Sequence, residues 1–160
     1  MDEFDLFNRI MICSKTKSGK SYLARFLIDK YKNHFDKIIL ICPTEKMNRF
    51  YEGLVKEQDI YETVDEEWIK QLFNRISNIK KEDIKQVLII ADDSGNEDFV
   101  KTKAFKNLFS KGRHYGLNIL FLSQYLYMLP AQCRSNLDYI ICGQKNLIFQ
   151  IIKKNIRRRI

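Results

Sequence analysis

The residues best able to do chemistry lie in the segment Ser14–Ser21, which reads SKTKSGKS. A P-loop has the pattern G-x-x-x-x-G-K-[ST], in which backbone N–H groups and the amino end of a helix surround the β-phosphate of a nucleotide. Gly19 would let the backbone approach the phosphate, Lys20 would reach the β- and γ-phosphate oxygens, and the Ser21 hydroxyl would bind Mg²⁺. The segment therefore predicts a site for ATP and Mg²⁺, with the nucleotide-binding residues Ser14, Lys15, Thr16, Lys17, Ser18, Gly19, Lys20, Ser21 and Tyr22.

One position departs from the P-loop pattern, because Ser14 stands where the first glycine is expected. A backbone conformation that is easy for glycine would carry a strain of about 1 kcal/mol at this serine. A Gly-Lys-Ser tripeptide alone also arises by chance in a lysine-rich chain. The flanks favour the P-loop, because the apolar run RIMIC ends just before the turn and an amphipathic helix begins within it.

A second candidate site follows the apolar run QVLIIA, which leads into Asp92 and Asp93. In a Walker B site the first carboxylate holds Mg²⁺ opposite the P-loop hydroxyl, and the adjacent one orients or deprotonates the attacking water. We therefore expect Asp92 and Ser21 to hold the metal and Asp93 to act on the water. The alternative is an Asp-Asp-Ser-Gly turn that caps the next helix.

Further polar residues lie around the apolar run NILFLS. Gln124 follows this run, where its amide would contact the γ-phosphate or the lytic water and sense hydrolysis. Arg113 and Arg134 flank the run and are candidates to neutralise transition-state charge, within the chain or from a neighbouring subunit. The ordinary alternatives are a polar strand end and surface arginines. We assign His114 to packing or to a DNA-facing side rather than to catalysis.

Apolar runs alternate with amphipathic stretches along the chain, which is typical of a parallel sheet covered by helices on both faces. The predicted fold class is therefore α/β, with three layers in the order αβα. Apolar spacing predicts helices over Glu66–Ile79 and Glu97–Lys111, and the basic stretch Asn146–Ile160 is expected to be a last helix or a tail. The predicted strands are nearly continuous in hydrophobicity and comprise Arg9–Cys13, Lys37–Cys42, Gln86–Ala91, Asn118–Ser123 and Tyr139–Cys142.

The composition fits one folded domain over residues 1–160, because 45% of the residues are hydrophobic and 30% are charged. A formal net charge of +8 suits a polyanionic partner, and lysine-rich solvated faces are an equally good explanation of it. The start MDEFDLF is unlike a signal peptide, and no apolar run approaches the roughly 20 residues that cross a bilayer. We therefore expect an intracellular protein, with free thiols at its four cysteines.

Three segments together resemble the FtsK-HerA superfamily, and within it the genome-packaging ATPases of poxviruses and other large DNA viruses. The segments are CSKTKSGKS, LIIADD and LFSKGRHYGLNILFLSQYLYMLPAQCRSNLDYIIC. The third is the most specific, because a Gly-Arg-His element leads into a strand that ends at Gln124, and a Leu-Pro turn and Arg134 precede Asn136–Tyr139. The resemblance covers approximately Phe7 to Gly143.

The resemblance implies a RecA-like (ASCE) P-loop NTPase core whose strands, numbered along the chain, lie in the order 5-1-4-3-2. It also implies a homo-oligomeric, hexameric ring that uses ATP and Mg²⁺ to pump double-stranded DNA into a capsid, with capsid proteins as further partners. Such a motor works in the host cytoplasm or viral factory, or with the virion. By the resemblance, Lys20 and Ser21 would bind the nucleotide and Mg²⁺, and Asp92 would bind the metal. Asp93 would replace a catalytic glutamate. Gln124 would be the sensor.

Two other functions share part of this pattern. A small P-loop nucleoside or nucleotide kinase would have the same phosphate turn, but it should also offer an acceptor pocket and a basic lid. A non-catalytic nucleotide- and DNA-binding protein would fit the basic composition and the missing first glycine. The polar strand ends at Asp92, Asp93 and Gln124 favour a hydrolase.

Overall fold

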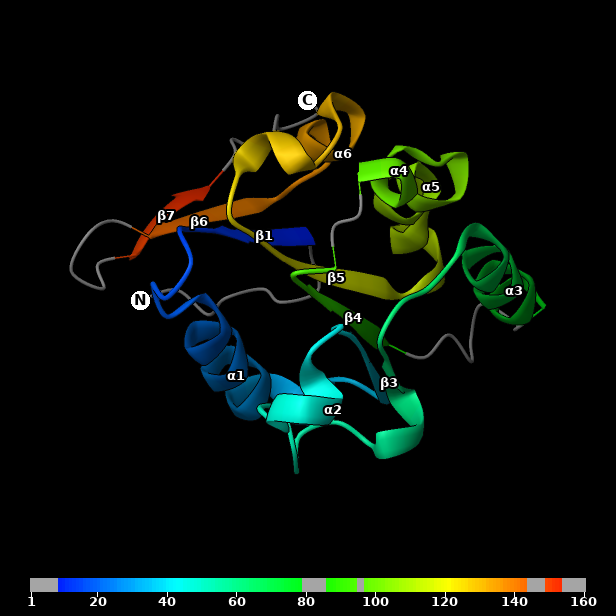
Figure 1. Cartoon of the computed structure of the whole chain (residues 1–160). Coiled ribbons are helices and arrows are strands. Elements are labelled where there is room, and N and C mark those ends of the chain that lie inside the picture. Colours follow the sequence, from blue (N-terminus) through cyan, green and yellow to red (C-terminus); the bar gives the residue numbers. More distant parts are fainter. Residues whose placement is uncertain (1–8, 79–85, 95–96, 144–148, 154–160) are drawn as a thin grey trace.

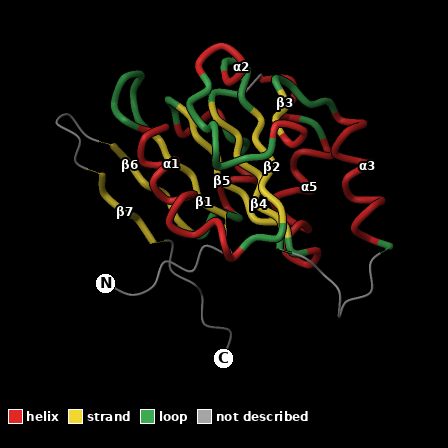
Figure 2. Tube along the Cα trace, turned by 90° about the horizontal axis from the view of Figure 1, so that it is seen from below, coloured by secondary structure: helices red, strands yellow, loops and turns green. Residues whose placement is uncertain are grey.

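The apolar runs of the sequence form the centre of one sheet in the computed structural model, which describes residues 9–78, 86–94, 97–143 and 149–153. Helices cover both faces of this sheet, so the three predicted layers are present (Figures 1 and 2). The central strands are β1 (Arg9–Cys13), β2 (Lys37–Ile41), β4 (Val87–Asp92), β5 (Leu117–Ser123) and β6 (Tyr139–Gly143).

The strands lie in the order β3-β2-β4-β5-β1-β6-β7. The five central strands are parallel and, numbered along the chain, have the order 5-1-4-3-2 read from the β6 side. This confirms the predicted fold class and strand order. Two strands were not predicted, namely the short parallel strand β3 (Ile60–Tyr61) beside β2 and the antiparallel strand β7 (Phe149–Lys153) beside β6.

Strand β7 corrects the expectation of a helix near the carboxyl end. Its five residues pair with β6 from Tyr139↔Lys153 to Gly143↔Phe149. An open sheet edge offers a row of unpaired backbone groups, so pairing there overrides the weak local preference for a helix. The rest of the predicted helix or tail, residues 146–148 and 154–160, lies outside the described residues.

The helices divide between the two faces of the sheet (Figure 1). One face carries α1 (Lys20–Tyr31) and α2 (Glu45–Asn48), and the other carries α3 (Glu66–Ser77), α4 (Glu97–Lys101), α5 (Lys103–Lys111) and α6 (Ala131–Ser135). The helix predicted over Glu97–Lys111 is broken at Thr102, because the Thr102 hydroxyl accepts the Phe105 N–H at 3.2 Å and starts α5. Short 3₁₀ turns lie at Lys32–His34, Glu57–Asp59, Gly112–Tyr115 and Leu126–Met128.

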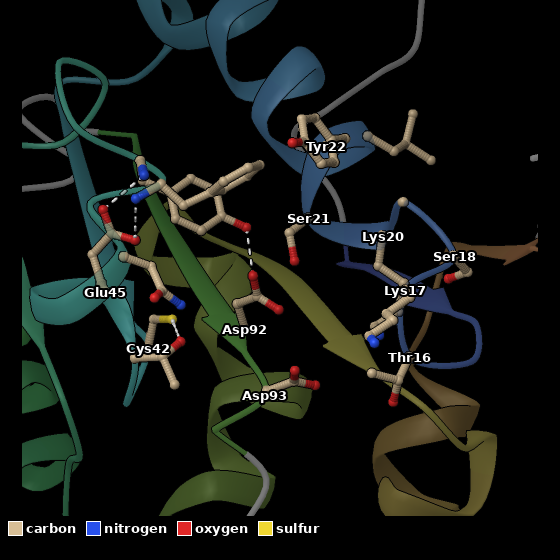
Figure 3. A pocket seen from close by; sticks show the side chains of 16 residues that line it. Thr16, Lys17, Ser18, Lys20, Ser21, Tyr22, Cys42, Glu45, Asp92 and Asp93 are labelled. Atoms are coloured by element: carbon tan, nitrogen blue, oxygen red, sulfur yellow. Dashed lines mark hydrogen bonds between the residues drawn. The ribbon is translucent and has the colours of Figure 1, made fainter.

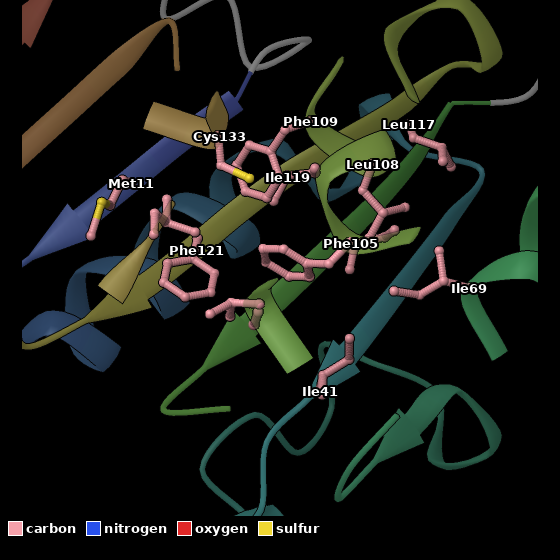
Figure 4. Close-up of a cluster of buried hydrophobic side chains, with 14 of the residues drawn as sticks. Met11, Ile41, Ile69, Phe105, Leu108, Phe109, Leu117, Ile119, Phe121 and Cys133 are labelled. Carbon is pink, nitrogen blue, oxygen red and sulfur yellow. The ribbon is translucent and has the colours of Figure 1, made fainter. Parts of the chain in front are cut away.

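Side chains of the strands alternate between two cores. Met11 packs with the rings of Phe105, Phe109 and Phe121 beneath α5 and α6, as Figure 4 shows. Its neighbours Ile10 and Ile12 pack on the opposite face against α1. Each fully buried side chain of this size contributes roughly 1.5–3 kcal/mol, so both faces of the sheet stabilise the fold.

The strand register places three polar strand ends at one edge of the sheet. Cys13 is paired with Ser123, and Asp92 is paired with Leu122. Strand β5 lies between β4 and β1, so the turn after β1 and the residues after β4 and β5 emerge at the same edge. Ligands of open parallel sheets bind at this carboxyl edge. Within the described part of the chain, no helix is long and apolar enough to span a membrane.

Candidate active site

The turn between β1 and α1 presents open backbone donors. Gly19 precedes α1 with φ 87° and ψ 13°, a left-handed conformation that glycine adopts without steric cost. The N-cap residue is Gly19, which has no side chain to cap α1, so the first N–H groups of the helix are available to an anion. Lys20, the first residue of the helix, is only 6% exposed. The turn has the arrangement that phosphate binding requires.

Ser14 does not carry the expected backbone strain. Among the described non-glycine residues, positive φ occurs at Lys17, Arg49 and Asp93, and not at Ser14. The Ser14 amide donates to the Ser123 carbonyl at 3.1 Å, and its hydroxyl donates to the Gly143 carbonyl at 3.4 Å. The serine therefore ties the start of the turn to the ends of β5 and β6. The left-handed residues of the loop are Gly19 and Lys17, the latter with φ 60°.

A cleft of about 980 Å³ lies between this turn and the segment after β2 (Figure 3). Its wall brings together most of the predicted residues, namely Thr16, Lys17, Ser18, Gly19, Lys20, Ser21, Tyr22, Asp92 and Asp93. Ser14 lies buried beneath the turn and Lys15 is exposed, so neither lines the cleft. The remaining wall is Leu23, Cys42, Thr44, Glu45, Asn48, Phe50 and Tyr51.

Asp92 is a buried carboxylate, only 4% exposed. Burial raises its pKa, while hydrogen bonding from Tyr51 and the nearby Ser21 hydroxyl act to lower it. The Tyr51 hydroxyl donates to Asp92 Oδ2 at 2.7 Å. The other oxygen, Oδ1, is buried without a hydrogen-bond partner among the described residues.

The residues present fit a Mg²⁺ ion bound together with a nucleotide. The Ser21 hydroxyl points toward Asp92 (Figure 3), so a serine oxygen and the unpaired carboxylate oxygen face the same space. The buried Ser18 hydroxyl also lacks a partner among the described residues. No described group of three or more His, Cys, Asp or Glu residues forms a protein-only metal cage, and Mg²⁺ commonly completes its shell with phosphate oxygens and water.

Asp93 lines the same cleft because the chain turns sharply there. Successive side chains of a strand point to opposite faces, and Asp93 breaks this alternation with φ 48°. Aspartate tolerates the left-handed conformation better than most residues. The exposed Asp93 carboxylate and the buried Asp92 carboxylate therefore both face the cleft.

Gln124 lies directly after β5, between the P-loop strand and the strand of Asp92. It is exposed, and its carbonyl accepts a weak hydrogen bond from the Cys13 thiol at 3.6 Å. Its side chain is not part of the cleft wall. The structure thus places Gln124 at the expected edge, next to the cleft.

Neither predicted arginine reaches the cleft of its own chain. Arg113 lies before β5, at the opposite sheet edge, where it contacts both oxygens of Asp138 at 2.8 and 2.7 Å. Arg134 lies in α6 and donates to the Leu129 carbonyl. Action of Arg113 or Arg134 on this site would therefore require a second subunit or a rearrangement.

Seven residues of the wall were not predicted from the sequence, and Glu45 and Tyr51 are the two whose contacts bear on Asp92. They are 3% and 1% exposed, although residues 45–59 are mostly polar. The apolar pairs Phe50–Tyr51 and Leu54–Val55 are the local sign that part of this segment is buried. The contact of Tyr51 with Asp92 joins residues 41 positions apart, and no local pattern encodes such a contact.

Comparison with known proteins finds relatives from several viruses. The sequence profile of the family described as "Poxvirus A32 protein" matches residues 4–157. The uncharacterized protein 015R of frog virus 3 (isolate Goorha) is 27% identical over 142 residues, which are 86% of this chain and 44% of that protein. The chain spans about half the length of the curated relatives it matches.

Solved structures show the same fold. The genome packaging NTPase B204 from Sulfolobus turreted icosahedral virus 2, in complex with ATP-gammaS, has a TM-score of 0.64 and 19% identity, covering 89% of this chain and 78% of that one. The cytoplasmic domain of the Type VII secretion ATPase EccC of Thermomonospora curvata has a TM-score of 0.67 and 11% identity, covering 96% of this chain and 23% of that one. The chain therefore shares its fold with a viral genome packaging NTPase and a secretion ATPase.

Proposed function

This chain belongs to the poxvirus A32 protein family, and from that premise we propose that it is an ATP-hydrolysing motor that moves viral double-stranded DNA into a capsid. One observation carries the proposal. The uncapped amino end of α1, the Ser21 hydroxyl and the unpaired Oδ1 of buried Asp92 converge on one cleft. An ordinary buried carboxylate is fully paired, so this arrangement favours a site for a metal and phosphates.

In the proposed mechanism each residue has one task. The amides at the start of α1 and the Lys20 ammonium bind the β- and γ-phosphates. Ser21 and Asp92 would hold Mg²⁺, which would supply positive charge against the charge that develops on the phosphates. Asp93, at the mouth of the cleft, orients the attacking water and accepts its proton. Gln124 contacts the γ-phosphate or this water and reports whether the phosphate is present.

The loop after Gln124 supports assembly into a ring, which we propose is hexameric. Tyr125, Leu126 and Tyr127 are 50%, 40% and 69% exposed, and the two tyrosine rings stack with centroids 5.1 Å apart. Exposed apolar clusters of this kind favour contact with another protein surface. Because the loop begins next to Gln124, a change at the γ-phosphate has a short path to a neighbouring subunit or to a capsid protein.

A basic groove supports a DNA partner. Helices α3 and α5 border a groove of about 450 Å³, lined in part by Lys70, Lys103 and Lys111 together with the amides of Asn74 and Asn107. Glu66, the one carboxylate among the described residues of its wall, lies 3.9 Å from the Lys70 ammonium. Lysines in such a groove suit the phosphates of a DNA backbone. This motor would act where capsids are filled, in the host cytoplasm or viral factory.

Steady-state phosphate release with and without duplex DNA tests the proposal. We expect DNA to stimulate release, and Lys20→Ala to lower it by at least about 100-fold, because a charge that stabilises the transition state is lost. Lys30→Ala, at the far end of the same helix, is the control and should leave release unchanged.

Two results would contradict the motor. Phosphoryl transfer to a nucleoside or nucleotide, without stimulation by DNA, would indicate a kinase. Nucleotide and DNA binding without any release that depends on Lys20 would indicate a non-catalytic binding protein.

A further inference from the structure

The contact between Tyr51 and Asp92 is buried at both ends. The two residues are 1% and 4% exposed, and the phenol donates to Asp92 Oδ2 at 2.7 Å. A hydrogen bond to a charged acceptor is stronger than one between neutral groups. Tyr51 therefore fixes the rotation of the carboxylate and occupies one of its two oxygens, which leaves Oδ1 facing the Ser21 side of the cleft (Figure 3).

A second buried carboxylate holds Tyr51 in place. Glu45, 3% exposed, accepts the Phe50 N–H at 3.1 Å through Oε2 and the Tyr51 N–H at 2.7 Å through Oε1. The chain folds back over Glu45 because Arg49 takes a left-handed conformation, with φ 46°. Using both oxygens on backbone amides offsets the cost of burying the carboxylate. The backbone at Tyr51 is thus fixed by the same side chain that begins α2.

The same segment is anchored to the P-loop helix through Phe50. The Phe50 ring lies edge-on to Tyr22 with centroids 4.9 Å apart, and Arg25 donates to the Phe50 carbonyl. Segment 45–51 therefore spans from α1, which carries Ser21, to the end of β4, which carries Asp92. Segment 45–51 therefore holds the Ser21 hydroxyl oxygen and Asp92 Oδ1, the two candidate metal ligands, at a fixed separation.

We propose that Glu45 and Tyr51 are positioning residues that present Asp92 to the metal through Oδ1 alone, an inference that rests on the proposed function. Single-oxygen contact suits Mg²⁺, which demands near-ideal octahedral geometry, whereas Ca²⁺ accepts both oxygens of a carboxylate. Without the Tyr51 hydroxyl the carboxylate is free to turn and to offer both oxygens. Segment 45–51 thus sets both the affinity of the site for Mg²⁺ and its preference for Mg²⁺ over Ca²⁺.

Equilibrium binding of a fluorescent ATP analogue to the full chain tests the inference. Binding is titrated against Mg²⁺, against Ca²⁺ and in EDTA, for the wild type, Tyr51→Phe, Glu45→Gln and the control Tyr31→Phe. Tyr51→Phe removes one oxygen atom and keeps the ring in the core, and Tyr31 lies on α1 outside the cleft wall. Melting temperature is measured alongside to separate positioning from loss of fold.

For Tyr51→Phe we expect the half-saturating Mg²⁺ concentration to rise by about 10-fold to 100-fold, the usual effect of removing a residue that orients a metal ligand. The Ca²⁺ requirement should rise less, and binding in EDTA should stay within about twofold of wild type. Glu45→Gln should shift the Mg²⁺ requirement in the same direction, because its amide can accept only one of the two N–H bonds. Tyr31→Phe should match the wild type.

An unchanged Mg²⁺ requirement in Tyr51→Phe would overturn the inference. Equal loss of binding with Mg²⁺, with Ca²⁺ and in EDTA would also overturn it, because a purely structural role predicts that result. If the wild type itself shows no binding that depends on Mg²⁺ and on Lys20, the proposed function fails, and the inference fails with it.

Discussion

At the scale of single residues, the site depends on the Asp92 carboxylate, whose burial destabilises the folded chain. Asp92 is 4% exposed, one of its oxygens has no partner among the described residues, and burial raises its pKa. An ionised group in this position is less stable in the folded chain than in water. The binding of a cation from solution explains why a carboxylate is present at position 92.

Replacing Asp92 should therefore separate stability from function. We expect Asp92→Asn to stabilise the ligand-free chain at neutral pH by about 1 kcal/mol, roughly 2–4 °C in melting temperature, because a buried charge is removed and an oxygen remains for Tyr51. The same variant should lose the extra melting temperature that Mg²⁺ and ATP give the wild type. A less stable variant that still responds to Mg²⁺ would contradict this account of the residue.

At the scale of elements, the strands that could be predicted from the sequence are those with a clear local pattern of apolar residues. Apolar runs buried on both faces, such as the one leading to Asp92, identified the five central strands, and the resemblance supplied their order. The edge strands were missed because β3 has only two residues and β7 lies within a basic stretch, where its formation depends on pairing with the open side of β6.

The site residues that directly follow a strand could likewise be predicted from the sequence, and those that reach the site through long-range contacts could not. The P-loop and the two aspartates follow strands directly, so their common edge could be inferred from parallel pairing. Glu45 and Tyr51 reach the site through contacts between separate segments, and no local periodicity records these. Arg113 and Arg134 were placed by sequence order alone, and the structure puts neither in the cleft wall.

A buried thiol in helix α6 makes the stability of the fold depend on pH. Cys133 of this helix is 0% exposed, and burial raises the pKa of its thiol from 9.0 to about 11. Between these values the unfolded chain loses the thiol proton and the folded chain keeps it. The free energy of unfolding should therefore fall by roughly 2 kcal/mol from pH 9 to pH 11 because of this group.

Chemical denaturation across this pH range measures the effect. Cys133→Ala should show a smaller fall than the wild type, although its stability at pH 7 should be lower because a core side chain is shortened. Part of the fall should remain in the variant, because burial also raises the pKa of Cys13 and Cys42. Parallel pH curves for the wild type and the variant would show that the Cys133 thiol ionises equally in both states.

At the scale of the whole molecule, the nucleotide cleft and the basic groove belong to different parts of the surface. The cleft lies at the carboxyl edge of the sheet beside α1, and the groove lies between α3 and α5 on the other face. The proposed motor would use such a division, with one surface holding DNA while the other changes with the nucleotide.

Removing two charges from the groove should uncouple DNA from hydrolysis. For Lys103→Gln with Lys111→Gln, we expect weaker DNA binding, less stimulation of phosphate release, and unchanged release without DNA. The slope of log affinity against log salt should fall by about 2, because each lost phosphate contact releases roughly 0.9 counterion fewer. Lys30→Gln with Lys32→Gln removes the same charge at the end of α1 and is the control. Equal weakening in both double variants would point to net charge alone.

The most direct test of the central claim is a structure of the chain with Mg²⁺ and a slowly hydrolysed ATP analogue. The account predicts the β-phosphate on the N–H groups at the start of α1, Mg²⁺ about 2.1 Å from the Ser21 hydroxyl oxygen and on the side of Asp92 Oδ1, and Tyr51 still bound to Oδ2. A nucleotide bound away from residues 14–21, or a metal that approaches neither Ser21 nor Asp92, would contradict it.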